Sequence, residues 1–251
     1  MPAEESTPAI VLRARDYADA DRIVTLLTRD QGKLSGIAKG AKASHRRFER
    51  KLEPFSQVTL YFRRRPHGQL VFITRAERGD LPPAPVEDDL AKIALGSYML
   101  ELADALTSEE AEATAAYEVL TGAIAAMSAV VASNALRQAY ELHILNATGF
   151  GLEFAYCRAC SAPVGGDGAI AYFVPARGGV ICQGCRPASE GGVRLGAASI
   201  AALEQLARSR FSCAAATSAC AGEDGRLAIS RFLATILDRK LRSLEFLNSI
   251  L

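Results

Sequence analysis

Short apolar runs separated by turn residues fill the first third of the chain. Five of these runs predict strands, at residues 9–13, 23–27, 34–38, 56–62 and 70–74. Turn signals lie between them, such as the acidic stretch 16–21 and the Pro66-His67-Gly68 triplet. Because no helix-length segment separates the runs, they favour a small closed or partly open barrel over a βαβ unit.

The hydrophobic period changes after the proline-rich stretch 81–85. Three prolines within four positions stop both a helix and a strand ladder, so we predict two domains, 1–81 and 82–251. Beyond this boundary, apolar residues recur at helical spacing. Helices are predicted from Leu90 to Leu106, from a capping box of Thr107 and Glu110 to Val130, from Ser133-Asn134 to Gly149, and over 197–208 and 225–246. The chain is therefore predicted to be α+β, a barrel followed by a helical domain.

Two C-x-x-C pairs interrupt the helical part, in an insert at about residues 155–188. They are Cys157 with Cys160 and Cys182 with Cys185. The glycine-rich spacer has a composition typical of a zinc ribbon, with a candidate strand at 170–174 and a further short strand predicted at 179–181, leading into the second pair. Four thiolates from two tight turns complete a closed tetrahedral site, so the spacing predicts one structural Zn²⁺ without catalytic chemistry.

Other fates of the cysteines are weaker interpretations. Two disulfides would require an oxidising compartment, and a redox C-x-x-C would require a βαβ context. We interpret Cys213 and Cys220 as buried apolar residues or exposed free thiols, and not as metal ligands.

Composition indicates an ordinary globular protein. The 251 residues are 49% hydrophobic and 23% charged. The N-terminus has acids where a secretory signal would be basic, and the uncharged stretch 119–136 is rich in alanine and contains polar residues, so a buried helix fits it better than a membrane span. We therefore expect a soluble cytoplasmic protein.

Charge is distributed unevenly. Residues 1–80 contain 16 Lys and Arg against 10 Asp and Glu, whereas residues 81–251 contain 13 against 18. Between Lys33 and Lys51, seven cations accompany a single acid, Glu49. A cationic loop with an aromatic residue, Phe48, suits a polyanion whose bases can also stack, although a solvated surface loop is the alternative.

These considerations give a set of candidate nucleic-acid-binding residues. It comprises Lys33, Lys39, Lys42, His45, Arg46, Arg47, Arg50 and Lys51, together with a second cluster, Arg63, Arg64 and Arg65. Tyr61, Phe62 and Phe72 are candidates for stacking on bases, although strand alternation buries about half of such residues.

Catalytic motifs are not recognisable. The chain has no phosphate-binding GxxxxGK[ST], and its three histidines, His45, His67 and His143, fall in different predicted environments. We expect a protein that is not an enzyme. A nuclease would need an acidic metal cluster that the sequence does not show. The rival interpretation is a zinc-ribbon adaptor that binds protein partners without contacting DNA.

An ordered set of segments runs through almost the whole chain and resembles the RecO family of bacterial recombination mediators. The set comprises 17–28, 32–34, 38–42, 52–55, 98–102, 149–151, both C-x-x-C pairs and 241–247. At the third predicted helix the chain reads Leu136-Arg137-Gln138-Ala139-Tyr140-Glu141, one residue longer than the L-R-x-F-E that is typical of the family.

The resemblance implies an N-terminal OB-fold that binds single- and double-stranded DNA, and a helical domain that carries a zinc ribbon. It further implies strand annealing without ATP and cooperation with RecR, which helps RecA displace single-strand-binding protein, with RecF as a further candidate partner. The acidic C-terminal tail of single-strand-binding protein would bind the helical domain. Arg137 is the candidate tail-binding residue, although it falls one position early when Tyr140-Glu141 sets the alignment.

Overall fold

A computed structural model gives the structure of the chain. It describes residues 3–48, 50–65, 70–79, 89–109, 111–166, 168–186, 191–211 and 220–251, without the side chains of His45 and Arg46. The chain divides into two compact units, Met1–Ser128 with Ile250 and Ala129–Ser249 with Leu251. The proline-rich stretch 81–85, His67, Glu110 and Cys213 lie outside the described residues, so the predicted domain boundary stays a prediction.

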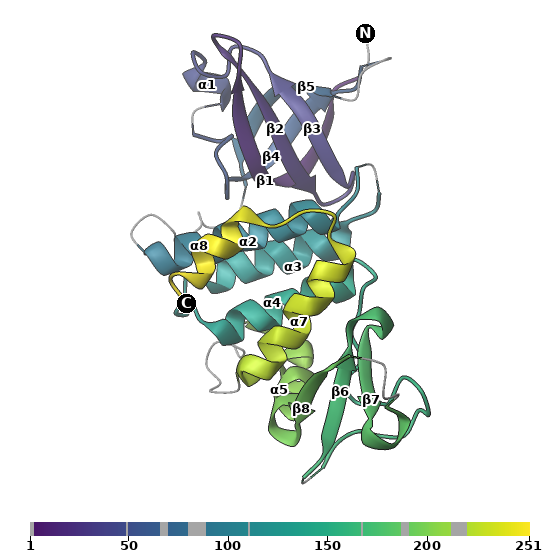
Figure 1. The fold of residues 1–251 in the computed structure, drawn as a ribbon. Coiled ribbons are helices and arrows are strands. Elements are labelled where there is room, and N and C mark those ends of the chain that lie inside the picture. The colour runs from purple at the N-terminus through teal and green to yellow at the C-terminus, as the bar shows by residue number, and fades with distance from the viewer. Residues whose placement is uncertain are drawn as a thin grey trace. The chain divides into compact units, whose positions relative to one another are not determined.

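Five strands form a closed barrel in the first unit, in the order β1-β2-β3-β5-β4 (Figure 1). They are β1 (Glu5–Tyr17), β2 (Asp21–Thr28), β3 (Lys33–Ala38), β4 (Gln57–Arg63) and β5 (Val71–Arg78). Strands β3 and β5 run parallel, whereas the other neighbouring pairs are antiparallel. The five predicted strands are confirmed, and they close into an OB-type barrel.

Alternation of side chains fills the barrel. In β4, Val58, Leu60 and Phe62 are buried, and the residues between them are partly exposed. This period of two matches a strand with one face on the core. Gly36 lets β3 approach β5 closely, since a Cβ at this position would lie 2.7 Å from the Ile73 side chain. A larger residue would push these two strands apart.

The connection between β3 and β4 contains a short helix, α1 (His45–Phe48), that was not predicted. Phe48 is only 3% exposed and belongs to the barrel core together with Leu52. The prediction that Phe48 offers its ring to bases is therefore wrong, because the ring anchors α1 to the barrel. Phe62 is also fully buried and cannot stack on a base.

Two helices follow in the same unit, α2 (Leu90–Leu106) and α3 (Thr114–Ala126). Helix α2 has the predicted bounds, and the Asp89 carboxylate caps it by accepting from the amides of Ala91 and Lys92. The predicted capping box at Thr107 is wrong. The Thr107 hydroxyl donates to the Ala103 carbonyl 2.7 Å away, so this residue ends α2 and does not begin α3.

The second unit contains α4 (Asn134–Ala147), α5 (Ala197–Arg208), α7 (Gly222–Ile236) and α8 (Arg242–Asn248). Ser133 caps α4 as predicted, and Gly149 follows this helix with φ +86°, a conformation that favours glycine. The single helix predicted over 225–246 is wrong. Helix α7 ends at Ile236, and three exposed charged residues, Asp238, Arg239 and Lys240, precede α8.

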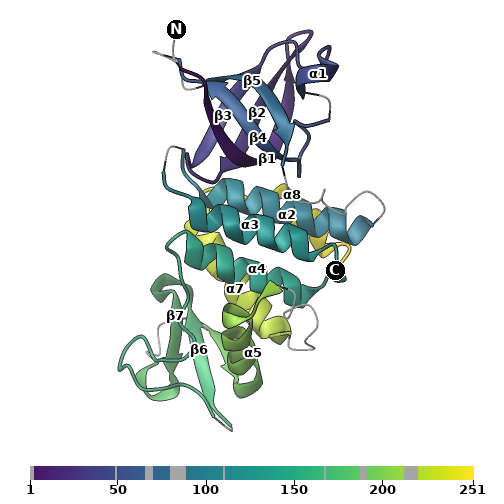
Figure 2. The same cartoon turned by 180° about the vertical axis from the view of Figure 1, so that it is seen from behind.

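A three-stranded sheet completes the second unit, in the order β7-β6-β8 (Figure 1), and Figure 2 shows β6 and β7 from behind. Strands β6 (Ile170–Val174) and β7 (Gly179–Cys182) were predicted, whereas β8 (Val193–Gly196) was not. The rings of Phe154 and Phe232 lie beside Phe173 of β6, with centroids 5.7 and 6.4 Å away. The inner face of this sheet is therefore packed against α7.

No described helix is both long enough and apolar enough to cross a membrane. The uncharged stretch 119–136 is divided between the end of α3 and the start of α4.

Candidate functional site

The four predicted ligand cysteines come together at one end of the β6–β7 hairpin. Their sulfur atoms all lie within 4.8 Å of one another, and the Sγ atoms of Cys160 and Cys182 are 3.9 Å apart. Tetrahedral zinc at the usual Zn–S distance separates its sulfurs by about 3.8 Å. The cluster therefore fits one metal ion with four sulfur ligands.

Backbone geometry brings the two pairs together. The first pair lies in a turn in which the Cys157 amide donates to Ala162 and the Ser161 amide donates to Cys157. The second pair begins in β7 and continues into a turn of 3₁₀ helix, Gln183–Cys185. The Arg158 amide donates to the Val180 carbonyl, 2.9 Å away, and so fixes the first turn against β7.

The thiols of Cys157 and Cys185 have pKa values shifted in opposite directions. Burial acts to raise the pKa of Cys157, but amides of Cys182, Ala159 and Cys160 lower it more, to about 6. Hydrogen bonds with Cys160 and Cys182 raise the pKa of Cys185 to about 12. Amides that point at a sulfur stabilise a thiolate, which is the form that binds metal.

The predicted DNA-contacting cations do not share one environment. Lys39, Arg47 and Arg50 are exposed and form no ion pair with any residue in the described ranges. Arg47 donates to the Lys39 carbonyl, 3.1 Å away, and its guanidinium lies over the Phe48 ring. Lys42 pairs with Asp16 at 2.9 Å, and Lys51 is half-buried. This part of the segment follows the end of β3, beside the turn between β1 and β2.

Other predicted cations lie toward the opposite end of the strands and are engaged with protein groups. Lys33 is 14% exposed, and its ammonium donates to both the carboxylate and the carbonyl of Asp104 in α2. Arg64 pairs with Glu5 at 3.4 Å and donates to Gln31. Arg63 ends β4 and is partly buried. Arg65 is exposed, with its guanidinium 5.7 Å from the centre of the Phe72 ring.

The sequence analysis missed two exposed residues at the end of the barrel where Lys39 and Arg47 lie. Arg15 and Tyr17 are the outward residues at the end of β1, and Tyr17 is 52% exposed. Their signal was the alternation in the sequence Arg13-Ala14-Arg15-Asp16-Tyr17, which places every second side chain on one face of a strand. They were missed because the acids of the following turn dominate the local charge.

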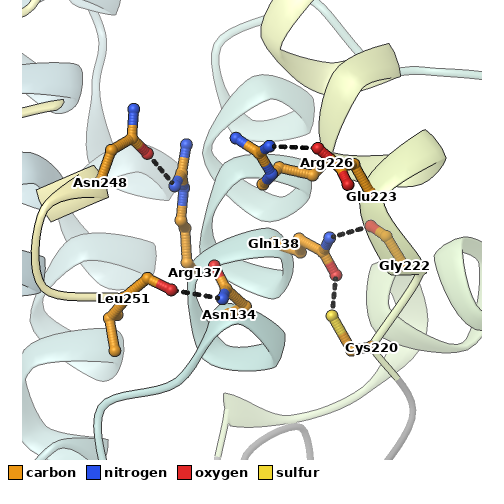
Figure 3. A pocket seen from close by; sticks show the side chains of 9 residues that line it. All are labelled: Asn134, Arg137, Gln138, Cys220, Gly222, Glu223, Arg226, Asn248 and Leu251. Carbon is orange, nitrogen blue, oxygen red and sulfur yellow. Dashed lines mark hydrogen bonds and ion pairs between the residues drawn. The ribbon is translucent and has the colours of Figure 1, made fainter. Parts of the chain in front are cut away.

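Arg137 lies in a cavity of about 520 Å³ in the second unit (Figure 3). This residue is 3% exposed, and its guanidinium donates to Glu141 at 3.0 Å and to Asn248 at 2.9 Å. Arg226 lines the same cavity and pairs with Glu223. The cavity is therefore polar, with two guanidinium groups on its wall.

Two remaining residues of the sequence analysis lie elsewhere in the second unit. The ring nitrogen Nε2 of His143 lies 2.9 Å from the Ser209 carbonyl, which fits the structural histidine that was predicted. Cys220 is exposed, and its sulfur lies 3.5 Å from the Gln138 side-chain oxygen, apart from the four-cysteine cluster.

Fold and site together define an OB-barrel protein with a helical part that carries an insert whose four cysteines could hold one metal ion. Family models for the N-terminal and C-terminal parts of recombination protein O match residues 1–80 and 87–246. The chain belongs to the RecO family of bacterial DNA repair proteins.

Relatives of this family align over nearly the full length of the chain. The DNA repair protein RecO of Anaeromyxobacter dehalogenans strain 2CP-C is 36% identical over 245 residues, which cover 96% of this chain and 94% of the relative. The RecO of a Nocardioides species is 32% identical, with 96% and 97% covered. The RecO of Syntrophus aciditrophicus strain SB is 29% identical, with 99% and 96% covered.

Proposed function

We propose that this protein is a recombination mediator. It binds single- and double-stranded DNA, anneals complementary strands without ATP, and with RecR helps to load RecA onto DNA coated by single-strand-binding protein. RecF is a further candidate partner, and the site of action is the cytoplasm, at the nucleoid. Family membership supports this proposal, and the cations Lys39, Arg47 and Arg50 at one end of the barrel, which lack acidic partners among the described residues, carry it.

Charge without sequence readout suits annealing. Two single strands repel each other through their phosphates, and cations that are not neutralised by protein acids can screen this repulsion. Such a surface needs no contact with base edges and breaks no covalent bond, so we propose that the protein is not an enzyme. Lys42, His45, Arg46 and Lys51 lie in the same segment and complete the proposed phosphate contacts there.

The cations at the opposite end have a smaller place in the proposal. Arg63, Arg64 and Arg65 remain candidate phosphate contacts, with Arg65 the most exposed of the three. Lys33 would have to leave Asp104 to reach DNA, because its ammonium is 3.3 Å from that carboxylate. We therefore propose that Lys33 acts mainly within the protein.

The metal is proposed to be one structural Zn²⁺, held by Cys157, Cys160, Cys182 and Cys185. Four sulfur ligands leave no open coordination position, so the ion would hold the two turns together and bind no substrate.

The acidic tail of single-strand-binding protein is the proposed ligand of the cavity at Arg137. The guanidinium groups of Arg137 and Arg226, which line this cavity, suit a carboxylate-rich peptide. Arg226 is the better probe, since its partner Glu223 is exposed, whereas Arg137 is buried in an ion pair. Arg226→Glu should abolish binding of a labelled tail peptide, and Arg231→Glu, an exposed change on the same helix, should not.

DNA binding is tested with the variant Lys39→Glu/Arg47→Glu/Arg50→Glu of the whole chain. Fluorescence anisotropy with labelled single and double strands should show at least about thirtyfold weaker binding of both forms, and a salt slope reduced by roughly two for single strands. Annealing of complementary strands should be lost together with binding, whereas zinc content should be unchanged.

The matched control replaces three exposed cations of the second unit by glutamate, at Arg194, Arg231 and Lys240. This variant should bind DNA within about twofold of the wild type if the barrel segment is the site. Near-normal binding by the barrel variant would overturn the proposed site. Failure of the wild type to bind either form of DNA would favour the adaptor that contacts only proteins.

A further inference from the structure

Each aromatic residue predicted to stack on bases either contacts an arginine of the barrel or is buried in its core. The Arg75 guanidinium lies 3.6 Å from the centre of the Tyr61 ring, and the Tyr61 hydroxyl donates to Glu77. The Phe72 ring lies beneath Arg65, whereas Phe62 is in the core. A base-stacking contact on this barrel therefore has to come from another residue.

Tyr17 is the exposed aromatic side chain in the described part of the first unit. It ends β1 and is 52% exposed. Within the described ranges its side chain makes no hydrogen bond and no ring contact. Contacts within the described part of the first unit do not account for its position, and the exposed side chain is accessible to an external partner.

Backbone contacts bring the cationic segment beside Tyr17. Asp21 pairs with Tyr17 across the β1–β2 hairpin, and its carboxylate accepts from the Gly40 amide at 2.8 Å. The Lys42 amide donates to the Ala20 carbonyl at 3.0 Å. The Arg47 guanidinium donates to the carbonyl of Lys39, the residue that precedes Gly40. Exposed cations therefore adjoin the exposed ring.

The charge around Tyr17 favours a phosphate chain. Arg15 precedes Tyr17 by two residues, shares its face of β1 and forms no ion pair among the residues described. Of the nearby acids, Asp16 is held by Lys42 and Arg22, and Asp21 is held by the Gly40 amide. Asp19 is exposed, and Asp21 keeps its charge because the Gly40 amide is neutral, so these two carboxylates oppose the cations. The three cations Arg15, Lys39 and Arg47 outnumber them.

We propose that a base of single-stranded DNA stacks on the ring of Tyr17. The side chains of Arg15, Lys39 and Arg47 would contact the phosphates on either side of that base. OB-type barrels often bind oligonucleotides through the loop between their first two strands, and Tyr17 is the last residue of β1 before that loop. Bases in a duplex are paired and stacked, so this contact serves single strands selectively. The inference rests on the proposed DNA binding and adds the residue that distinguishes the two forms.

A tryptophan reporter tests the contact directly. The chain has no tryptophan, so Tyr17→Trp introduces a single indole. Its fluorescence should be quenched when a single strand saturates the protein, because a stacked base quenches indole emission. A duplex at saturation should leave the emission almost unchanged.

Affinity measurements supply the second test. Tyr17→Ala should weaken single-strand binding about tenfold, the loss expected for one stacked base, and change duplex binding less than about twofold. A strand of abasic sugars should bind the wild type and Tyr17→Ala equally. Tyr156→Ala is the matched control, since Tyr156 is 54% exposed but lies in the second unit. It should leave all three affinities unchanged.

Several outcomes would overturn the inference. Unquenched indole emission from the Tyr17→Trp variant in a saturated complex excludes a stacked base, as does full single-strand affinity of Tyr17→Ala. An equal loss for single strands, duplex and abasic strands would show a role in folding or charge placement instead. Each of these results leaves DNA binding by the wild type intact, whereas a wild type that binds no DNA removes the proposed function as well.

Discussion

The barrel and the four-cysteine insert reach ordered structures by different means. The barrel encloses a cluster of buried apolar residues that includes Val24, Leu60 and Ile73, to which the connecting segment adds Phe48 and Leu52. The insert packs one face of its sheet on α7 through Phe173 and Phe232, and its four cysteines gather at the end of β7 that lies away from the β6–β7 turn. One region is therefore stabilised by burial of apolar area, whereas one end of the other is expected to be held together by a bound metal ion.

This difference separates the two sites functionally. The cations of the barrel are carried on strands with an apolar core, so the proposed DNA binding should survive removal of the proposed metal. The two cysteine-bearing turns of the insert should lose their structure when the metal is removed.

Metal removal should have the largest effect. A strong chelator, or Cys157→Ser, should abolish hydrogen-exchange protection in residues 157–162 and 180–185, because structural zinc supplies on the order of 10 kcal/mol in small zinc domains. Barrel amides should be unaffected, and DNA affinity should stay within about twofold. Cys220→Ser, a change of an exposed cysteine apart from the cluster, is the control. Loss of barrel protection would contradict the separation of the two sites.

Phe48→Ala should come next. Removing this buried ring should lower the free energy of unfolding of the barrel by about 3–5 kcal/mol and loosen residues 39–52, with DNA affinity falling as a consequence. Denaturant melts and exchange rates of the same variant measure both effects, and its zinc content should be normal. The exposed ring of Phe246 gives a control, since Phe246→Ala should cost less than about 1 kcal/mol.

Asp104→Ala should show that the paired cations act in folding. Without this carboxylate, Lys33 is left partly buried and unpaired in the site that also receives Arg13, so stability should fall by about 3 kcal/mol. DNA affinity should hardly change. Glu109→Ala, which removes a surface bond from the Ser35 hydroxyl, should cost about 0.5 kcal/mol at most. A large change in DNA affinity without a loss of stability would instead show that Lys33 reaches the DNA.

The smallest expected effect concerns pH. The hydrogen bond from Lys42 lowers the pKa of Asp16 below its ordinary value of 3.8, with a further contribution from Arg22. A depressed folded-state pKa stabilises the fold above the unfolded pKa, and this stabilisation is lost as the pH falls through the folded value. The stability difference between the wild type and Asp16→Asn should thus be constant near neutrality and shrink below about pH 4. A difference that grows in acid would contradict the ion pair.

Elements with their own repeat were predictable from sequence. The five strands, the bounds of α2 and α5, and the serine cap of α4 follow from periodicity and local hydrogen bonding. Thr107 fits two roles, since a hydroxyl can cap a following helix or return to the carbonyl four residues back, and tertiary packing selected the second. The break after Ile236 has no proline or glycine signal, so the pattern predicted one helix in place of two.

The cysteine cluster was also easier to predict from sequence than the environments of the barrel cations. Four cysteines must converge if they share one ion, so their spacing alone predicted the cluster. No comparable constraint acts on Lys33, Lys39 or Arg64. Lys33 pairs with Asp104 and Arg64 with Glu5, whereas Lys39 has no acidic partner among the described residues. Lys33 and Asp104 are separated by 71 residues, and no local pattern shows that they meet.

The ring of strands around the barrel limits how other proteins can bind there. With β1 joined to β4 and β3 joined to β5, no strand of the barrel lies along its whole length at an open edge among the residues that the structure describes. Only part of a strand is left paired on one side, as in β5 beyond Phe72, where its register with β3 ends. A partner strand would therefore find a short edge, so we expect recognition of the barrel by another protein to use mainly side chains and turns, where single substitutions can separate one partner from the next.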